Sequence, residues 1–357
     1  MIDQKAIDNL KRGSYASAMN PRPIGVDLFA GAGGMSLGFE QAGFDIVAAV
    51  EIDPVHCATH KFNFPHCTVL PRSVVGLSGK EIREKAELGT RRVDVVFGGA
   101  PCQGFSMIGQ RALDDPRNSL VRDFLRIVEE LDASYFVFEN VKGLTLGEHR
   151  RFLDEIVSRA DELGYDVRIP WRVLDAAHFG VPQHRERLFL LGAKKGRTHP
   201  NYPDEITQPA DGRGKLKKDV ATGPSAKDAL DDLPDADLFE QLTRSDETLG
   251  ASYGQPSAYA AELRCRTNEA WHFGYVRNWN PSVLTSSART CHTEISKRRF
   301  ARTNGGETEP ISRFYKLPAN GLSNTLRAGT DSARGAFTSP RPIHYRYARC
   351  VTVREMA

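Results

Sequence analysis

Long hydrophobic runs are missing from this 357-residue sequence, and none approaches the length of about 18 residues that a membrane-spanning helix needs. The N-terminus lacks the apolar core of a signal peptide. Paired cysteines of the C-x-x-C type are also missing, because the six cysteines are scattered along the chain. This cysteine usage indicates neither a disulfide framework nor a zinc ribbon. We therefore expect a soluble protein of the reducing cytoplasm, with no membrane partner.

A strong excess of charge of one sign is absent as well. The 48 lysines and arginines nearly balance the 45 acidic residues, which gives a formal net charge of +3. Such a balance permits a nucleic-acid partner without requiring one. The histidines and cysteines between His56 and Cys67 match no standard spacing of metal ligands, so we predict no metal site.

Apolar runs of strand length alternate with helical stretches from Ile24 onward. This alternation predicts an α/β protein with a doubly wound, mostly parallel, Rossmann-like sheet that helices cover on both faces. The predicted strands are Gly25–Phe29, Ile46–Val50, Val93–Phe97, Tyr135–Phe138 and Leu188–Leu191. Three of the predicted helices are Met35–Ala42, Leu120–Leu131 and Arg150–Leu163.

The character of the sequence changes after Gly192. Residues 1–23 are polar and predict an N-terminal arm, whereas residues 24–195 carry the α/β pattern. Residues 196–224 are rich in Gly, Pro, Asp and Lys, which predicts a linker. Residues 225–345 contain short apolar pieces among many Ser, Thr, Asn, Gly and Arg, which predicts a second, smaller, loop-rich domain suited to recognition.

A cysteine follows the predicted strand Val93–Phe97. The segment after that strand is Gly-Gly-Ala-Pro-Cys, in which Pro101 restricts the backbone immediately before Cys102. The carboxyl ends of parallel strands are where open α/β sheets place ligands and chemistry. Cys102 is therefore a candidate nucleophile, although a small buried hydrophobic residue is the alternative for a free cysteine.

A glycine-rich segment, Asp27-Leu28-Phe29-Ala30-Gly31-Ala32-Gly33-Gly34, ends the first predicted strand and opens a helix. Glycines there allow a ligand to approach a helix N-terminus, although a simple tight turn would use them too. The spacing is not the G-x-G-x-x-G of dinucleotide sites, and the next strand is followed by Glu51, whose carboxylate suits ribose hydroxyls. A nucleoside cofactor without a pyrophosphate is therefore favoured over NAD.

Two further strand ends carry polar groups. Glu139 lies near the end of the run Phe136–Val141, where a carboxyl group could act as an acid toward a bound base, or could form a cap or a salt bridge. The segment Gln183-His184-Arg185-Glu186-Arg187 precedes the last predicted strand. Strand periodicity would place Gln183, Arg185 and Arg187 on one face, either as an anion or carbonyl site or as a salt-bridge ladder.

The order of these motifs resembles that of the DNA cytosine-5 methyltransferases. The matching segments are DLFAGAGGMSLGFE, EIDP, GGAPCQGFS, FENVKG and QHRER, which together cover roughly residues 24–192. Further similar landmarks are Lys227–Pro234, Ser323–Thr330 and Val353–Ala357. The resemblance implies the S-adenosylmethionine-dependent methyltransferase fold, with residues 225–345 as the target-recognition domain for double-stranded DNA.

The same resemblance implies S-adenosyl-L-methionine as the cofactor. Phe29 would pack on its adenine, Glu51 would bind the ribose hydroxyls, and Ile52 would flank the ring. Ser73 stands where the family usually has an aspartate that holds the adenine amino group. The cofactor-binding residues implied are Asp27, Phe29, Gly31, Gly33, Gly34, Glu51, Ile52, Ser73, Pro101 and Leu120.

The resemblance also implies a covalent mechanism on a flipped-out cytosine. Cys102 would add to carbon 6 of the base, Glu139 would stabilise the protonated ring nitrogen 3, and Arg185 and Arg187 would anchor the base oxygen and the catalytic loop. That loop would be residues 103–119, with its DNA-facing side chains at Gln103, Ser106, Gly109 and Arg117.

The family continues beyond the R-E-x-A motif, so we expect residues 346–357 to begin a return to the catalytic domain that stops at Ala357. The expected setting is a nucleoid-associated restriction-modification or phage-defence system with a cognate endonuclease. The alternatives are a methyltransferase-like DNA-binding or scaffold chain, inactive without the remaining C-terminal segment, and a tRNA cytosine-5 methyltransferase.

Overall fold

The structure is a computed structural model that describes residues 22–101, 119–147, 149–213, 218–264, 280–326 and 341–357. Cys102 lies outside these ranges. So do most of the predicted N-terminal arm and the predicted loop residues Gln103, Ser106, Gly109 and Arg117.

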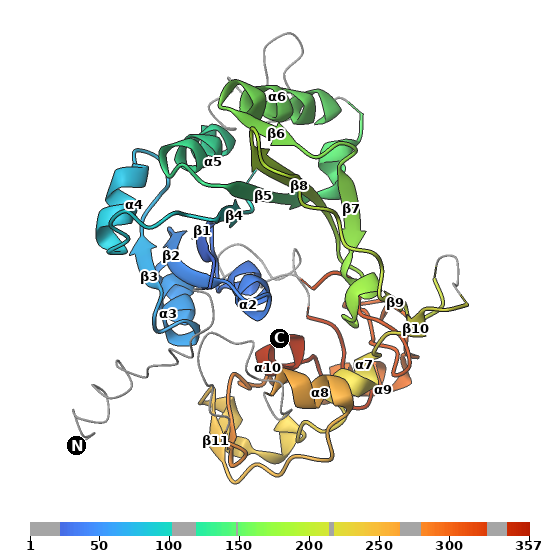
Figure 1. The fold of residues 1–357 in the computed structure, drawn as a ribbon. Helices are drawn as coiled ribbons and strands as arrows, with labels where there is room; N and C mark the ends of the chain where they lie inside the picture. The colour runs from blue at the N-terminus through green and yellow to red at the C-terminus, as the bar shows by residue number, and fades with distance from the viewer. Residues whose placement is uncertain (1–21, 102–118, 148, 214–217, 265–279, 327–340) are drawn as a thin grey trace, which may run out of the picture.

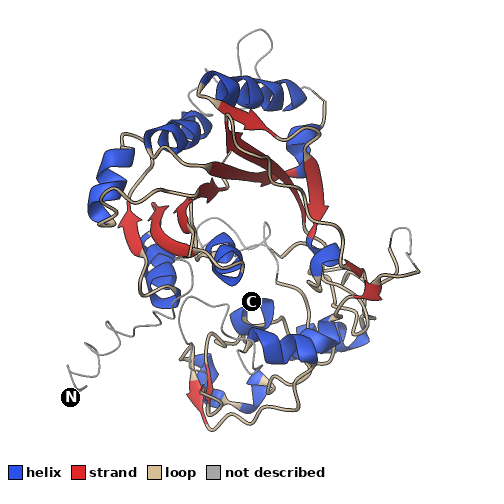
Figure 2. Cartoon of the chain, viewed as in Figure 1, coloured by secondary structure: helices blue, strands red, loops and turns tan. Residues whose placement is uncertain are grey.

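The central feature is an eight-stranded sheet in the order β3-β2-β1-β4-β5-β8-β6, with β7 paired to β8 (Figures 1 and 2). The pairs from β3 to β5 are parallel, and β8 is antiparallel to β5, β6 and β7. The doubly wound, mostly parallel sheet is thus confirmed. Its strands are β1 (Ile24–Leu28), β2 (Asp45–Glu51), β3 (Thr68–Pro71), β4 (Val95–Gly98), β5 (Tyr135–Val141), β6 (Tyr165–Val167), β7 (Arg172–Asp175) and β8 (Glu186–Lys194).

Helices cover both faces of this sheet because each has an apolar side. One face packs against α4, α5 and α6 in a core that contains Ile82, Phe124 and Ile156, and the other packs against α2 and the end of α3 through Phe39 and Phe64. The helices are α2 (Gly34–Gln41), α3 (Pro54–Asn63), α4 (Gly79–Lys85), α5 (Ser119–Glu130) and α6 (His149–Glu162).

The strand β8 and the residues before it position the predicted arginines. It runs against the parallel strands, so its first residues lie at the edge where β4 and β5 end. Its regular pairing starts at Glu186, whereas Gln183 forms a bridge to Ser323 and His184 N–H donates to the Ser323 carbonyl at 2.9 Å. The chain therefore changes its pairing partner before β8 begins, and the single face of Gln183, Arg185 and Arg187 stays a prediction.

The residues after about 220 gather in the lower part of Figure 1, where loops predominate over regular elements (Figure 2). Small hydrophobic cores stabilise this part of the chain. One contains Leu230 and Val351, and another contains Phe300 and Ile343. None of the helices in the described ranges is long and apolar enough to cross a membrane. The remaining strands and α-helices of the described residues are β9 (Thr207–Gln208), β10 (Ala221–Thr222), α7 (Ala226–Leu230), β11 (Thr248–Leu249), α8 (Ala258–Leu263), β12 (Val283–Leu284), α9 (Glu294–Arg302) and α10 (Val353–Met356).

Candidate active site

The glycine turn after β1 lies at the carboxyl edge of the sheet. Phe29 has a positive φ of 63°, and Gly33 caps α2 with a φ of 97°. A Cβ atom on Gly33 would lie 2.4 Å from the Phe64 ring, so this position requires glycine. Gly31 and Gly34 instead adjoin open space, with no atom within 4 Å of an added Cβ. The turn therefore leaves room for a ligand beside the N-terminus of α2.

Glu51, at the end of β2, is fixed against this turn by main-chain donors. Its Oε2 accepts from Gly31 N–H at 2.8 Å, and its Oε1 accepts from Ile52 N–H at 2.9 Å and Asp53 N–H at 2.8 Å. Since a carboxylate offers about four acceptor positions, one remains for a ligand hydroxyl. The neighbouring Ile52 side chain is 69% exposed, which leaves it available to cover an aromatic ring.

Asp27 lies behind the turn. It is only 1% exposed, and the Ser36 hydroxyl donates to its Oδ2 at 2.6 Å. The same Ser36 oxygen lies 3.0 Å from His60 Nε2, so the carboxyl group, the hydroxyl and the ring form one buried chain. Burial raises the pKa of Asp27 to about 7 and lowers that of His60 to about 4. These contacts assign Asp27 to the support of the turn rather than to its ligand-facing surface.

Three other predicted cofactor residues lie at or near element ends on this edge. Ser73 follows β3, and its half-buried hydroxyl accepts from Val75 N–H at 3.1 Å. Pro101 is exposed beyond β4, and Leu120 packs half-buried against the large core from the start of α5.

Glu139 lies beside the residues that lead to Cys102. Because β4 pairs with β5 and Gly98 is opposite Phe138, the carboxyl group of Glu139 overlies Gly99. A Cβ atom on Gly99 would be 2.7 Å from Glu139 Oε2. The next residue, Asn140, is buried and donates from its side-chain amide to the Ala100 carbonyl at 3.1 Å. Our sequence analysis did not single out Asn140, although it stands inside the quoted segment FENVKG.

Arg187 faces the same carboxyl group from β8. Its Nε lies 2.8 Å from Glu139 Oε1, and the two side chains are 19% and 22% exposed. The register places Glu139 opposite Phe189, so Arg187 is the diagonal neighbour of Glu139 on one face of the sheet. Arg185 lies just before the strand and is half-buried, and burial and the charge of Arg187 both lower its pKa. Its Nη1 is 3.5 Å from the carbonyl of Leu326, a residue of the predicted recognition domain that is distant in the sequence.

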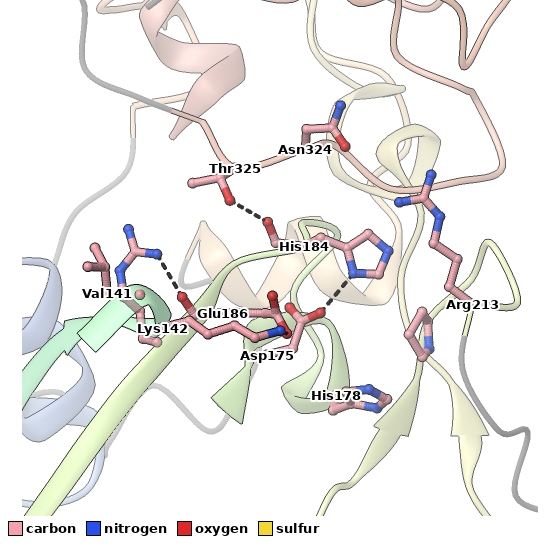
Figure 3. Close-up of a pocket in the computed structure, with 12 residues that line it drawn as sticks. Val141, Lys142, Asp175, His178, His184, Glu186, Arg213, Asn324 and Thr325 are labelled. Atoms are coloured by element: carbon pink, nitrogen blue, oxygen red, sulfur yellow. Dashed lines mark hydrogen bonds and ion pairs between the residues drawn. The ribbon is translucent and has the colours of Figure 1, made fainter. Parts of the chain in front are cut away.

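A cavity of about 730 Å³ is lined by Arg187 together with Asp175 at the end of β7 and Pro209 just after β9. Figure 3 shows Asp175, His178 and His184 among the residues of its wall. Of the predicted site residues that the structure describes, Arg187 is the one that lines it. Most of the residues that line the cavity are of polar types; the lining comprises Val141, Lys142, Gly143, Asp175, His178, His184, Glu186, Arg187, Pro209, Arg213, Asn324 and Thr325.

Comparison with known proteins agrees with this geometry. The family of C-5 cytosine-specific DNA methylases matches residues 25–357. Type II methyltransferase M.XorII of Xanthomonas oryzae pv. oryzae is 55% identical over 336 residues, which cover 94% of this chain and 76% of that protein. Type II methyltransferase M1.HphI of Haemophilus parahaemolyticus is 32% identical, with 93% and 75% covered.

A solved structure also matches most of the chain. It is described as a DNA modification methyltransferase encoded within an E. coli prophage, and it superposes with a TM-score of 0.70 at 28% identity. The match covers 94% of this chain and 87% of the other. The chain therefore belongs to the C-5 cytosine-specific DNA methylase family and is a DNA (cytosine-5) methyltransferase.

Proposed function

We propose that the chain transfers a methyl group from S-adenosylmethionine to carbon 5 of a cytosine flipped out of a specific duplex sequence, through a covalent adduct with Cys102. The observation that carries this proposal is the position of Glu139. Its carboxyl group overlies Gly99, three residues before Cys102, and is paired with Arg187. An acid and two arginines beside a strand exit that leads to a thiol suit attack on a polarised base.

The residues around the glycine turn fit S-adenosylmethionine. Open space lies at Gly31 and Gly34, Glu51 retains one acceptor position, and Ile52 presents an exposed apolar surface. When bound, this cofactor supplies an electrophilic methyl group on a sulfonium centre. The residues that would hold it are Phe29, Gly31, Gly33, Gly34, Glu51, Ile52, Ser73, Pro101 and Leu120, with Asp27 supporting the turn from behind.

Cys102 would act as the nucleophile at carbon 6 of the cytosine. Formation of the sulfur–carbon bond breaks the carbon 5–carbon 6 double bond and shifts its electron pair towards carbon 5 and nitrogen 3. Glu139 holds the proton at nitrogen 3, and carbon 5 becomes nucleophilic. Arg187 orients that carboxyl group, and Arg185 supports the base oxygen. After methylation, loss of the carbon 5 proton restores the double bond and expels the Cys102 thiolate. Both ring faces must be accessible, so the base has to leave the helix.

The names of the relatives support a biological setting. M.XorII and M1.HphI are both named Type II methyltransferases. We therefore place this chain in a restriction-modification or phage-defence system, acting on nucleoid DNA in the cytoplasm and accompanied by a cognate endonuclease. Residues 225–345 would contact base edges in the major groove, with arginines on the phosphates.

Covalent trapping tests the proposal. Bisulfite sequencing of DNA from cells that express the chain identifies the target, and a duplex with 5-fluorocytosine at that position should then trap wild-type protein in the presence of cofactor. Cys102→Ser should abolish trapping while cofactor affinity, measured by calorimetry, changes little. The exposed Cys291 provides the matched control, because Cys291→Ser should trap normally.

Two results would contradict the proposal. Trapping by Cys102→Ser would remove the nucleophile assignment. Failure of the wild-type chain to methylate or trap any duplex would favour the alternative of a DNA-binding or scaffold chain. Glu139→Gln should still bind DNA and cofactor but should methylate about 100- to 10,000-fold more slowly, the usual contribution of a general acid.

A further inference from the structure

His184 lies between two carboxylates at the wall of the cavity. Its Nδ1 is 2.8 Å from Asp175 Oδ2, the contact drawn as a dashed line in Figure 3, and its Nε2 is 3.0 Å from Asp211 Oδ2. A neutral imidazole has a single N–H, so it can donate to one of these oxygens and must present a lone pair to the other. A ring that donates to both must carry both protons and a positive charge. This geometry therefore favours the imidazolium form.

Asp175, at the end of β7, connects this ring to Arg185. Its Oδ2 contacts His184, whereas its Oδ1 accepts from Arg185 N–H at 2.8 Å and from Ala177 N–H at 3.2 Å. Ala176 N–H in turn donates to the Arg185 carbonyl at 3.1 Å. One carboxylate thus fixes both the orientation of the His184 ring and the main chain of Arg185 at the entry to β8.

The other side of His184 connects to segments far away in the sequence. Asp211 belongs to the predicted linker and lies 3.2 Å from Arg213 Nε. The Thr325 hydroxyl donates to the His184 carbonyl at 2.8 Å, and Leu326 N–H donates to the Gln183 side chain at 3.1 Å. The linker, residues 323–326 and the entry to β8 therefore meet at this histidine, three residues before Arg187, the arginine that faces Glu139 on the strand.

We infer that His184, charged and shared between Asp175 and Asp211, is a positioning residue for Arg185 in the methyl-transfer reaction. This inference rests on the proposed role of Arg185. The charged cluster connects the entry to β8, where both arginines lie, to the linker, so that the main chain of Arg185 is positioned before DNA binds. A neutral His184 ring can donate to only one of the two carboxylates. Its deprotonation therefore breaks the hydrogen bond either to Asp211 or to Asp175, the carboxylate that holds the Arg185 main chain.

The charges around the ring determine the direction of its pH dependence. Partial burial opposes ionisation of His184, but the hydrogen bonds to Asp175 and Asp211 outweigh it, and its pKa lies above the ordinary value. The other titratable or charged groups on the packed segments are Arg185 and Arg187 at β8, Arg213 in the linker, Tyr315 near Asp211, and Lys142, His178 and Glu186 across the cavity. The positioning contact is thus present at lower pH and is lost as pH rises through that raised pKa.

The test compares His184→Gln with a control from the same cavity. His178 also lines the cavity, but its Nδ1 lies near the Thr207 carbonyl at 3.3 Å, and its ring has no hydrogen bond to Asp175 or Asp211 in the described residues. The activity of wild-type, His184→Gln, His184→Arg, Asp175→Asn and His178→Gln protein is measured against pH on the identified duplex. Cofactor affinity is measured in parallel, and ring titration is followed by NMR.

We expect His184→Gln to lower kcat by about 10- to 100-fold, as a small misplacement of a positioning group does, with cofactor affinity unchanged. The alkaline decline of kcat should disappear in this variant. His184→Arg, which keeps the charge and two donors, should restore most of the rate, and His178→Gln should resemble wild type. By NMR, Asp175→Asn should lower the pKa of His184.

Three outcomes would overturn the inference. The first is an unchanged kcat and pH profile in His184→Gln. The second is an equal loss in His184→Gln and His178→Gln, which would show a merely structural role, and the third is a His184 ring that titrates no higher than a free histidine. Failure of the proposed function itself is recognised separately, because the wild-type chain would then neither methylate nor trap the duplex.

Discussion

Two aspartate–histidine assemblies flank the proposed active site at the carboxyl edge of the parallel strands, and they favour opposite ionisation states. Behind the glycine turn, burial raises the pKa of Asp27 to about 7 and lowers that of His60 to about 4, which favours uncharged groups. At the entry to β8, hydrogen bonds outweigh burial, lowering the pKa of Asp175 and raising that of His184. The same two residue types are therefore used once as a nearly neutral buried chain and once as an ionic cluster.

The two assemblies differ in ionisation because they differ in solvent exposure and in whether the aspartate contacts the histidine directly. Asp27, Ser36 and His60 are buried, and a hydroxyl group separates the carboxyl group from the ring. His184 keeps 19% of its side-chain surface and contacts two carboxylates directly. Solvent and direct opposite charges stabilise ions, whereas burial with a neutral intermediary does not. The charge state of either assembly therefore cannot be predicted from the presence of an aspartate and a histidine in the sequence.

The largest expected effect comes from removing the buried carboxyl group with Asp27→Asn. The folded chain binds this proton more tightly than the unfolded chain, so Asp27 lowers stability as pH rises from about 4 to about 7. A pKa of about 7 against about 3.9 when unfolded corresponds to at most about 4 kcal/mol. Over that range the unfolding free energy of Asp27→Asn, measured with urea, should rise relative to wild type by up to this amount. Parallel pH profiles would contradict the neutral assignment.

A smaller effect is expected from Ser36→Ala, which removes the hydroxyl that joins Asp27 to His60. Two buried polar groups then lose a partner, at a cost of about 1–3 kcal/mol in the free energy of unfolding. Ser134 is the matched control, because it is equally buried and its hydroxyl has no hydrogen-bond partner among the described residues. Ser134→Ala should leave stability nearly unchanged. Equal losses in the two variants would show that the chain of contacts behind the turn contributes nothing.

The smallest effect on stability is expected from His184→Gln. Because the folded-state pKa of His184 is raised, its contribution is present at about pH 6 and is lost as pH rises. The side chains remain partly exposed, so the variant should lose less than about 1 kcal/mol at low pH and still less in high salt. Urea unfolding at two pH values and two salt concentrations measures this. A loss that grows with pH would reverse the assignment of charge.

Most of the sheet could be predicted from the sequence, because the spacing of apolar residues and the glycines that end the strands are local signals. It placed β1, β2, β4, β5 and β8 to within a few residues, and it indicated α2, α5 and α6. The strands β3, β6 and β7 are short, and tertiary pairing rather than local sequence defines them. The direction of β8 was not predictable, since an apolar run is the same whichever way the chain traverses the sheet.

The site was predictable where it depended on neighbouring strands. Glu139 was expected near the end of its strand, and the pairing of β4 with β5 brings it over Gly99. Contacts between distant segments were not: the amide of Asn140 on Ala100, the burial of Asp27, and the cluster of Asp175 with Asp211 all depend on how the chain folds back. Single-sequence patterns carry no information about such pairings.

The register of β8 also limits how the length of this segment can vary in evolution. Arg187 reaches Glu139 because it lies opposite Val141, two positions from Phe189 along the strand. A single inserted residue between Arg187 and Leu188 would turn the arginine to the opposite face of the sheet, where no compensating substitution at Glu139 could restore the pair. Insertions and deletions should therefore accumulate in the region between Lys195 and Ser225, while the interval from Gln183 to Leu191 keeps a constant length among active relatives.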